Sequence, residues 1–242
     1  MRKFAVVGIL AVFSSSYSLD FQYSLKSFTW KEYEAGKQLL KESGFLHEFG
    51  FSHRFDAEVL YIKPYAGIEI GSVNYDGQTQ SGTPVETDTN YWGVLTRLCI
   101  GKEIGLFFGE TGVGYDYWKR NLETSSAIGY TETWSQFYVP LRVGLQGNIS
   151  ETKLYWFGEY RINIRTKNEP SISPVTLEPK ADLFFTIGGG IEVKRLKFEL
   201  SYSYDKWKKS DREYYLSGGY VYAVWQPESK REVVRFTAGY SF

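Results

Sequence analysis

The sequence of 242 residues predicts an all-β fold: a transmembrane, antiparallel, up-and-down β-barrel, most simply of ten strands. Aromatic residues make up 18% of the chain and there are 24 glycines, a mixture that suits strands with aromatic girdles better than helices rich in Leu and Ala. Segments of barrel-strand length alternate between apolar and polar residues. Tight connections alternate with long polar ones, as in barrels with short turns at one end and longer loops at the other.

The clearest alternation lies in residues 58–74, where every second residue is apolar. The members of this face are Leu60, Ile62, Pro64, Ala66, Ile68 and Ile70. A period of two describes one face of a strand. The other face carries Lys63 and Glu69, which a dry core would reject and a polar lumen accepts. The same pattern recurs along the chain, so the apolar face is expected to contact lipid.

Strand parity sets the number of strands. Nine segments follow from Phe45 onward, and single-chain bacterial barrels have an even number of strands. Residues 19–25 alternate and supply the tenth, which places both ends of the mature chain on one side. Residues 31–44 then become the first long loop, with room for a helical turn at 37–41. The alternative is an eight-stranded barrel, with residues 19–44 as a periplasmic extension.

Connections and irregularities follow from the same pattern. Tight turns are expected at residues 56–57, 102–103, 148–152 and 194–195. Long polar loops are expected at residues 76–89, 118–130, 166–180 and 206–231. In residues 104–117 the apolar positions change parity, which predicts a bulge near Gly109–Gly112. Residues 214–225 alternate inside the last loop and predict a further hairpin.

Residues 1–18 have the composition of a cleaved signal peptide. Arg2 and Lys3 precede an apolar stretch, and small residues stand before the expected cleavage after Ser18. The apolar stretch is too short to cross a bilayer as a helix. The remaining single domain, residues 19–242, keeps 26 of the 28 basic residues against 28 acidic ones, because Arg2 and Lys3 are removed. This balance does not point to nucleic acid.

The last segment ends on an aromatic residue. Phe236, Ala238, Tyr240 and Phe242 share one face of the final strand. Such an ending resembles the assembly signal of bacterial outer-membrane proteins, carried here by Phe236, Tyr240 and Phe242. The resemblance implies the outer membrane of a Gram-negative (diderm) bacterium and the barrel assembly machinery as a partner.

A ten-strand count also resembles the omptin architecture, in layout only. Omptin proteases use an Asp–His pair and an Asp pair at the external rim. The two histidines of this chain, His47 and His53, do not stand in an Asp-x-His arrangement, so proteolysis is not predicted. Ser52 precedes His53, but adjacent residues on a strand point to opposite faces and cannot form a nucleophile–base pair. His47 and His53 are the residues that an outer-membrane lipid hydrolase would have to use.

Cofactors and metals are not predicted. The single cysteine, Cys99, excludes an internal disulfide framework and a Cys-rich metal site, and no phosphate loop or zinc spacing occurs. The membrane partners expected are outer-membrane lipid and lipopolysaccharide. A basic cluster in the last loop could contact lipopolysaccharide phosphates by charge-assisted hydrogen bonds. Its members are Lys206, Lys208, Lys209 and Arg212.

Charged residues on the inward faces are the most informative functional feature. The predicted lumen network consists of Lys63, Glu69, Arg97, Arg142, Glu159, Arg161, Glu192, Lys197, Glu199 and Arg235. A ten-stranded barrel is little wider than one that side chains can fill, so these charges should pair and plug the lumen. The sequence therefore favours a monomeric, non-enzymatic, porin-like barrel with a structural or surface-interaction role. A narrow passive pore is the first alternative, and a lipid hydrolase using His47 or His53 is the second.

Overall fold

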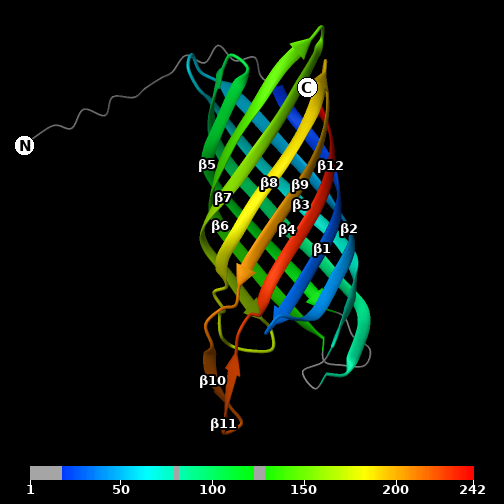
Figure 1. The fold of residues 1–242 in the computed structure, drawn as a ribbon, viewed down its shortest axis with the longest axis vertical. Helices are drawn as coiled ribbons and strands as arrows, with labels where there is room; N and C mark the ends of the chain where they lie inside the picture. The colour runs from blue at the N-terminus through cyan, green and yellow to red at the C-terminus, as the bar shows by residue number, and fades with distance from the viewer. Residues whose placement is uncertain (1–17, 79–81, 123–128) are drawn as a thin grey trace, which may run out of the picture.

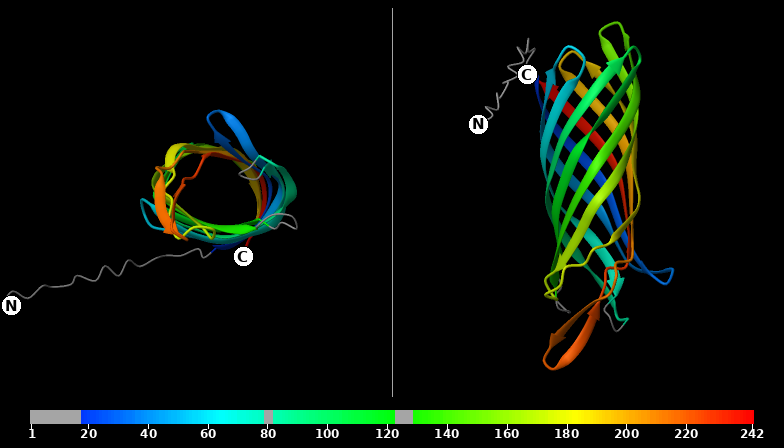
Figure 2. Two further views of the ribbon diagram at one scale, coloured as in Figure 1. Left: turned by 90° about the horizontal axis from the view of Figure 1, so that it is seen from below. Right: turned by 90° about the vertical axis from the view of Figure 1, so that its left-hand side faces the viewer.

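The computed structural model describes residues 18–78, 82–122 and 129–242. In this part of the chain ten strands form a closed antiparallel barrel, and two more form a separate hairpin (Figures 1 and 2). The ten-stranded barrel is confirmed, and the eight-stranded alternative is wrong. The predicted signal peptide lies outside the described residues, apart from Ser18, at which the first strand begins. No helix of the described residues is long and apolar enough to cross a membrane.

The barrel follows a simple up-and-down order, because each strand pairs with its neighbours along the chain. Its strands are β1 (Ser18–Glu34), β2 (Lys37–Asp56), β3 (Tyr61–Gln78), β4 (Pro84–Ile104), β5 (Phe107–Leu122), β6 (Tyr130–Ile149), β7 (Thr152–Pro170), β8 (Lys180–Val193), β9 (Leu196–Lys208) and β12 (Glu228–Ser241). β1 pairs with β12 and closes the barrel, with Asp20 opposite Ser241. The beginning of β1 and the end of β12 therefore lie at one end, here called the terminal end (Figure 1). The opposite end is called the loop end.

The first long loop was predicted wrongly. Residues 31–44 continue β1 and β2 up to a two-residue turn at Ala35 and Gly36, both with positive φ (50° and 80°). The helical turn expected at 37–41 is strand. The reason is tertiary: Trp30, Glu32 and Glu42 point into the barrel, where their partners come from distant strands.

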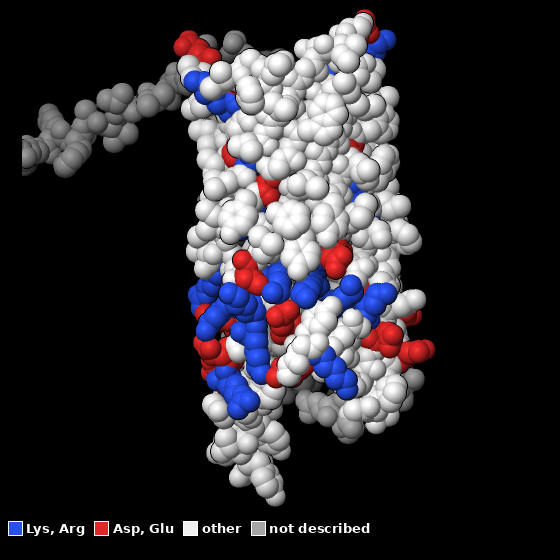
Figure 3. Space-filling view, viewed as in Figure 1, with Lys and Arg blue, Asp and Glu red and all other residues white. Residues whose placement is uncertain are grey.

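The other long loops are also shorter than predicted, since strands extend into both ends of each. Barrel strands run from 13 residues in β9 to 21 in β4, whereas 9–11 tilted residues cross a bilayer. The extra length continues the barrel wall toward the loop end, past the uncharged belt that Figure 3 shows.

The predicted bulge at Gly109–Gly112 is wrong. The β4–β5 register is uninterrupted, and the turn lies at Gly105–Leu106 rather than at 102–103. The apparent change of parity arises because residues 104–106 belong to the previous strand and its turn. Phe108, whose spacing from Ile104 would have put it on the outward face, points inward together with Glu110.

An apolar belt surrounds the barrel at the terminal end. Outward side chains such as Ile68 and Leu200 are 55% and 59% exposed. On β1 the outward positions become polar after Leu25, at Ser27, Thr29 and Lys31. Figure 3 shows this uncharged belt and a band of charged side chains adjoining it toward the loop end.

The hairpin of β10 (Glu213–Ser217) and β11 (Tyr220–Val224) projects beyond the loop end (Figure 1). The alternation of residues 214–225 therefore did predict strand. At its base, the carboxylate of Glu34 accepts hydrogen bonds from Lys209 Nζ (2.5 Å) and Trp225 Nε1 (3.1 Å). These bonds hold the pKa of Glu34, which lies beyond the apolar belt, below its usual range.

Candidate functional site: the lumen

Glu159 on β7 is the centre of the charge network in mid-barrel. Its Oε2 lies 3.1 Å from Nη1 of Arg97 on β4 and 2.7 Å from Nη2 of Arg142 on β6. Arg161 Nε lies 3.9 Å from the other oxygen of Glu159, and Arg161 also pairs with Asp205 of β9. The structure thus brings together four residues that the sequence predicted for the lumen. Asp205 was missed because the strand was expected to end there, immediately before a loop at residues 206–231. In the structure β9 continues to Lys208, so Asp205 lies within the barrel wall.

A second group lies between β12, β1, β2 and β3. Lys26 forms ion pairs with Glu48 and with Glu69, and Nη2 of Arg235 lies 3.4 Å from Oε2 of Glu48. Tyr65 donates its hydroxyl hydrogen to Glu48. Glu69 and Arg235 were predicted, whereas Lys26 and Glu48 were not. The sequence could have predicted both, because each alternates with the apolar residues of its own strand and therefore lies on the inward face.

The remaining predicted lumen residues lie toward the terminal end. Lys197 and Glu199 of β9 are 3.7 Å apart (Nζ–Oε2). Glu192 faces Lys197 across the β8–β9 ladder, and Lys63 lines a cavity with Glu110. Within the described part of the chain, neither Glu192 nor Lys63 forms an ion pair within 4.0 Å. The structure therefore places all ten residues on the inward face but pairs them unevenly.

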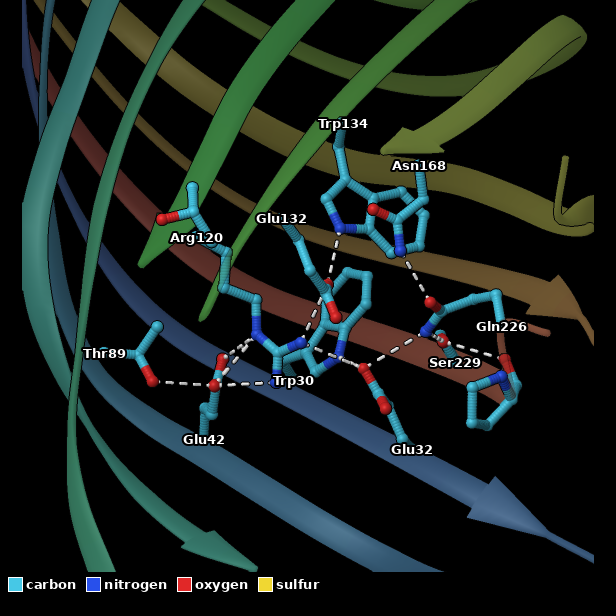
Figure 4. Close-up of polar contacts among 12 residues, drawn as sticks. Trp30, Glu32, Glu42, Thr89, Arg120, Glu132, Trp134, Asn168, Gln226 and Ser229 are labelled. Carbon is cyan, nitrogen blue, oxygen red and sulfur yellow. Dashed lines mark hydrogen bonds and ion pairs between the residues drawn. The ribbon is translucent and has the colours of Figure 1, made fainter. Parts of the chain in front are cut away.

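Arg120 of β5 is surrounded by three carboxylates at the loop end, where the sequence predicted a loop. Its Nη2 lies 2.8 Å from Glu42 of β2, and its Nη1 lies 2.9 Å from Glu132 of β6. Glu32 of β1 is 3.2 Å from the same Nη1. Figure 4 shows these side chains converging from four strands, with Thr89 donating to Glu42 at 2.8 Å. Arg120 and Glu42 are 2% and 0% exposed.

Four tryptophans pack around this charged group. Trp118 and Trp134 stack at 5.5 Å with an interplanar angle of 10°, and Trp30 meets Trp134 edge-on at 5.2 Å. Trp207 lies 5.4 Å from Trp30, centroid to centroid. The indoles of Trp30 and Trp134 donate hydrogen bonds of 2.9 Å to Glu32 and Glu132 (Figure 4).

We call this set the loop-end cluster: Trp30, Glu32, Glu42, Trp118, Arg120, Glu132, Trp134 and Trp207. Trp207 falls in residues 206–231, which the sequence predicted as a loop, but it is fully buried inside the barrel. Period-two alternation through the supposed loops would have revealed the cluster, because its members occupy one face of each strand.

The lumen holds three small cavities. Their volumes are about 60 Å³ next to the loop-end cluster, about 90 Å³ in mid-barrel and about 180 Å³ at the terminal end. Arg142 lines all three and separates them. The two smaller spaces have room for only a few water molecules, since one water needs about 10–15 Å³ of such space.

The two histidines lie on the outer face of β2. Nδ1 of His47 is 2.8 Å from the hydroxyl oxygen of Tyr23, and their rings stack. His53 packs edge-on against Phe55 at 4.1 Å. Ser52 points inward and is 2% exposed, so it does not meet His53. Among the described residues no group of His, Cys, Asp and Glu could hold a metal ion.

Comparisons with known proteins support the fold. No family model and no curated protein matches the sequence. The outer membrane protease OmpT from Escherichia coli is similar at a TM-score of 0.52 and 11% identity, covering 93% of this chain and 97% of that one. The translocator domain of the autotransporter NalP from Neisseria meningitidis is similar at 0.56 and 14% identity, covering 93% and 88%. At these identities the likeness shows the fold alone.

The class that follows is an outer-membrane β-barrel. It rests on the closed ten-stranded antiparallel sheet, the outward apolar belt and the polar lumen. One of the two similar structures is named a protease and the other a translocator domain, so neither function is assigned to this chain.

Proposed function

We propose that this chain is a non-conducting barrel in the outer membrane of a Gram-negative bacterium, with a structural or surface-interaction role. The observation that carries the proposal is the loop-end cluster. Its four indoles and the group of Arg120 with its three carboxylates are 0–5% exposed and come from β1, β2, β5, β6 and β9. A lumen filled with buried side chains leaves no path for hydrated ions.

The charge network around Glu159, on the terminal-end side of the loop-end cluster, is proposed as a second plug. Glu159 with Arg97, Arg142 and Arg161 holds opposite charges close together in a confined space. Isolated buried charges are costly, and pairing compensates for part of the desolvation. The two plugs lie in series along the barrel axis.

A surface role is supported by the loop end, which we assign to the cell exterior. The β10–β11 hairpin projects there, and its apolar side chains are exposed. Tyr214 is 62% exposed, Leu216 72%, Tyr220 71% and Val221 71%. Exposed apolar groups clustered on a soluble-facing segment are typical of contact surfaces.

The proposed partners are outer-membrane lipid and lipopolysaccharide around the belt, and the barrel assembly machinery through the last strand. We propose a monomer without cofactor or metal and without enzymatic activity. His47, bonded to Tyr23 on the outer face, is the residue on which a lipid hydrolase would depend, and Ser52 is turned away from His53.

A narrow passive pore is the second candidate, favoured by the water-sized cavities along the lumen. Planar-bilayer recording of refolded protein separates the two. The wild type should show no steady conductance. Trp118→Ala with Trp134→Ala removes one plug, and Arg142→Ala with Arg161→Ala removes the other. Because the plugs are in series, each pair alone should stay closed and the quadruple variant should leak.

The control is Trp92→Ala, which removes an outward-facing indole and should stay closed. A large, stable, ion-selective current from the wild type would overturn the plugged barrel and establish the pore.

A further inference from the structure

The ladder between β7 and β8 is interrupted at one place. It is continuous up to the pair Tyr160–Phe185, and the next pair in the same register is Asn168–Leu177. No ladder pairs join residues 161–167 to residues 178–184. We call this opening the β7–β8 window.

Both strands are irregular at the window. The β6–β7 register shifts at Phe137/Tyr138 and leaves Ile164 as an extra residue in β7. The β8–β9 register shifts between Ala181 and Leu183 and leaves Asp182 as an extra residue in β8. Bulges bend a strand away from its partner, which accounts for the opening. Each edge of the window therefore has backbone N–H and C=O groups without ladder partners.

The window lies at the border of the apolar belt. Ile162 and Leu183 flank it on the outside and are each 42% exposed, while Leu183 is paired across β8–β9 with Lys206. Unpaired backbone groups are not tolerated against hydrocarbon. At this depth the partners available from the membrane are lipid headgroups, in which polar atoms begin where the acyl chains end.

An apolar groove adjoins the window on its terminal-end side, within the apolar belt. Its volume is about 580 Å³, within the roughly 300–1,000 Å³ range of small-molecule sites. Gly158 of β7 and Gly188 of β8, on adjacent strands, are among the residues that line it. Trp156, Ile187 and Leu200 are among its walls. A Cβ at Gly158 would meet nothing within 4 Å, so the groove is open there. Gly158 pairs with Ile187 only two residues before the ladder ends at Tyr160.

Cationic side chains surround the window. Lys206 and Lys208 both approach the one carboxylate of Asp182, at 2.7 and 3.4 Å. Arg165 pairs with Glu178 on the outside, where both are more than half exposed. An exposed ion pair such as Arg165–Glu178 contributes little to stability, so another anion can replace the carboxylate at small cost. Figure 3 shows the basic side chains gathered on this face next to the belt.

The wall formed by β3 and β4 carries carboxylates toward the loop end, beyond Ser72 of β3. Asp76 lies across the β3–β4 ladder from Glu86, and Asp88 follows on the same outer face of β4. Lys41 of β2 pairs with Asp76 in the β2–β3 ladder, so basic side chains are present on that wall as well. Lys206 and Lys208 are distinguished by their position beside the window and the groove, and not by being the barrel's only outward cations.

We propose that the window and the groove form one binding site for a phosphorylated glycolipid of the outer leaflet, with an acyl chain in the groove and the headgroup at the window. The inference rests on the proposed outer-membrane placement with the loop end outside, but not on the plugged lumen. Phosphate oxygens accept hydrogen bonds from Lys206, Lys208 and Arg165. Sugar hydroxyls both donate and accept, so they satisfy both kinds of free backbone group at the window.

Trp156 reports on occupancy of the groove, which it lines, and the outward Trp92 of β4, three strands away from β7, is the control. Protein is refolded into phosphatidylcholine vesicles that contain a small fraction of chain-brominated phosphatidate or chain-brominated phosphatidylcholine. Comparing the fluorescence of the Trp92→Phe and Trp156→Phe variants separates the two reporters, because the other tryptophans, four buried in the lumen and Trp225 at the base of the hairpin, are common to both. Phosphatidate should quench Trp156 more strongly than phosphatidylcholine, with a preference of roughly fivefold for each lysine engaged. Trp92 should not distinguish the two lipids.

Diphosphoryl lipid A should displace brominated phosphatidate and restore Trp156 fluorescence, and dephosphorylated lipid A should not.

Lys206→Ser with Lys208→Ser should remove the preference of the site for phosphatidate over phosphatidylcholine, while Lys41→Ser with Lys119→Ser on the other wall should preserve it. Gly158→Leu should fill the groove and abolish the excess quenching, while Ala66→Leu on β3 should not.

Equal quenching of Trp156 by the two headgroups in folded protein would overturn the site. If phosphatidate is preferred but diphosphoryl lipid A does not displace it, the glycolipid assignment is overturned and the ligand of the site is a phospholipid. Conductance plays no part in these readouts. Quenching of Trp156 by neither lipid would instead show that this face is not in the membrane, which is a failure of the proposed outer-membrane placement.

Discussion

Glu159 accepts hydrogen bonds from the guanidinium groups of Arg97 and Arg142 and lies 3.9 Å from that of Arg161, while only 4% of its surface is exposed. An exposed pair such as Arg165 and Glu178 has the same chemistry on the outside of the wall, where both side chains are more than half exposed. The two sites differ in what happens when one partner is lost. In the lumen the remaining charges keep their desolvation penalty, and on the surface water replaces the partner.

Glu159→Met should therefore lower the free energy of unfolding in detergent or vesicles by about 3–5 kcal/mol, because it leaves buried cations unpaired. Adding Arg142→Met should recover part of the loss. Glu178→Met, the surface control, should cost about 0–1 kcal/mol. Urea titration followed by tryptophan fluorescence measures all three. A double variant less stable than Glu159→Met would contradict the network.

The outward face is governed by lipid. Ile68, in mid-belt on β3, is 55% exposed, and Ser72 lies on the same face four residues closer to the loop end. Ile68→Arg should destabilise the folded barrel in lipid vesicles by about 2–4 kcal/mol, and Ser72→Arg by about 0–1 kcal/mol because it lies near the interface. Equal costs at the two positions in vesicle unfolding would show that the belt is misplaced.

Among the elements, the hairpins differ at the two ends of the barrel. Turns at the terminal end, such as Gly105–Leu106 and Ser150–Glu151, are two residues long. At the loop end the strands rise well beyond the belt, and even the two-residue turn at Ala35–Gly36 closes a hairpin whose inward side chains belong to the loop-end cluster. The two ends therefore differ both in how far the strands extend and in the connections, since residues 171–179 and 209–227 separate β7 from β8 and β9 from β12 at the loop end.

Protease sites inserted at the turns test this orientation. A site at Gly218–Gly219, the tip of the projecting hairpin, or at Ala35–Gly36 should be cut on intact cells. A matched site at Lys194–Arg195 or Ser150–Glu151 should be cut only after the outer membrane is broken. Cleavage at Lys194–Arg195 on intact cells would reverse the assignment of inside and outside.

The whole molecule is closed by its two ends. β12 pairs along its length with β1 and with β9, so the barrel is complete only when the last strand of the chain is in place. On that strand Phe236, Tyr240 and Phe242 all point outward and are 47%, 38% and 65% exposed. Because they point outward, a partner can contact them during assembly. If they act as the proposed assembly signal, replacing them should impair recognition in the cell more than it lowers the stability of the folded barrel.

Tyr240→Ala with Phe242→Ala should reduce the folded, heat-modifiable fraction in the outer membrane of expressing cells. Refolding of the same purified variant into detergent should remain efficient. Phe49→Ala, which removes an outward aromatic from β2, is the control and should assemble normally. If the terminal variant instead failed to refold in detergent, the residues would be structural and not a signal.

The amino-acid sequence by itself determined the class, the strand number and the two faces of the wall. These depend on a two-residue period, which is local: Ile68 and Lys63 are assigned to opposite faces by spacing alone. Parity then requires the tenth strand at residues 19–25. The same logic placed all ten predicted lumen charges on the inward face.

Only the tertiary structure decided where strands end, which charges meet and where the wall opens. Arg120 and Glu42 are 78 residues apart, and their contact depends on the registers of the strands between them. Polar residues such as Glu32 and Glu132 resemble loop in a sequence because their burial is compensated only by distant partners. The window likewise needs two bulges, at Ile164 and Asp182, to face each other. Long-range pairing, not local period, carries that information.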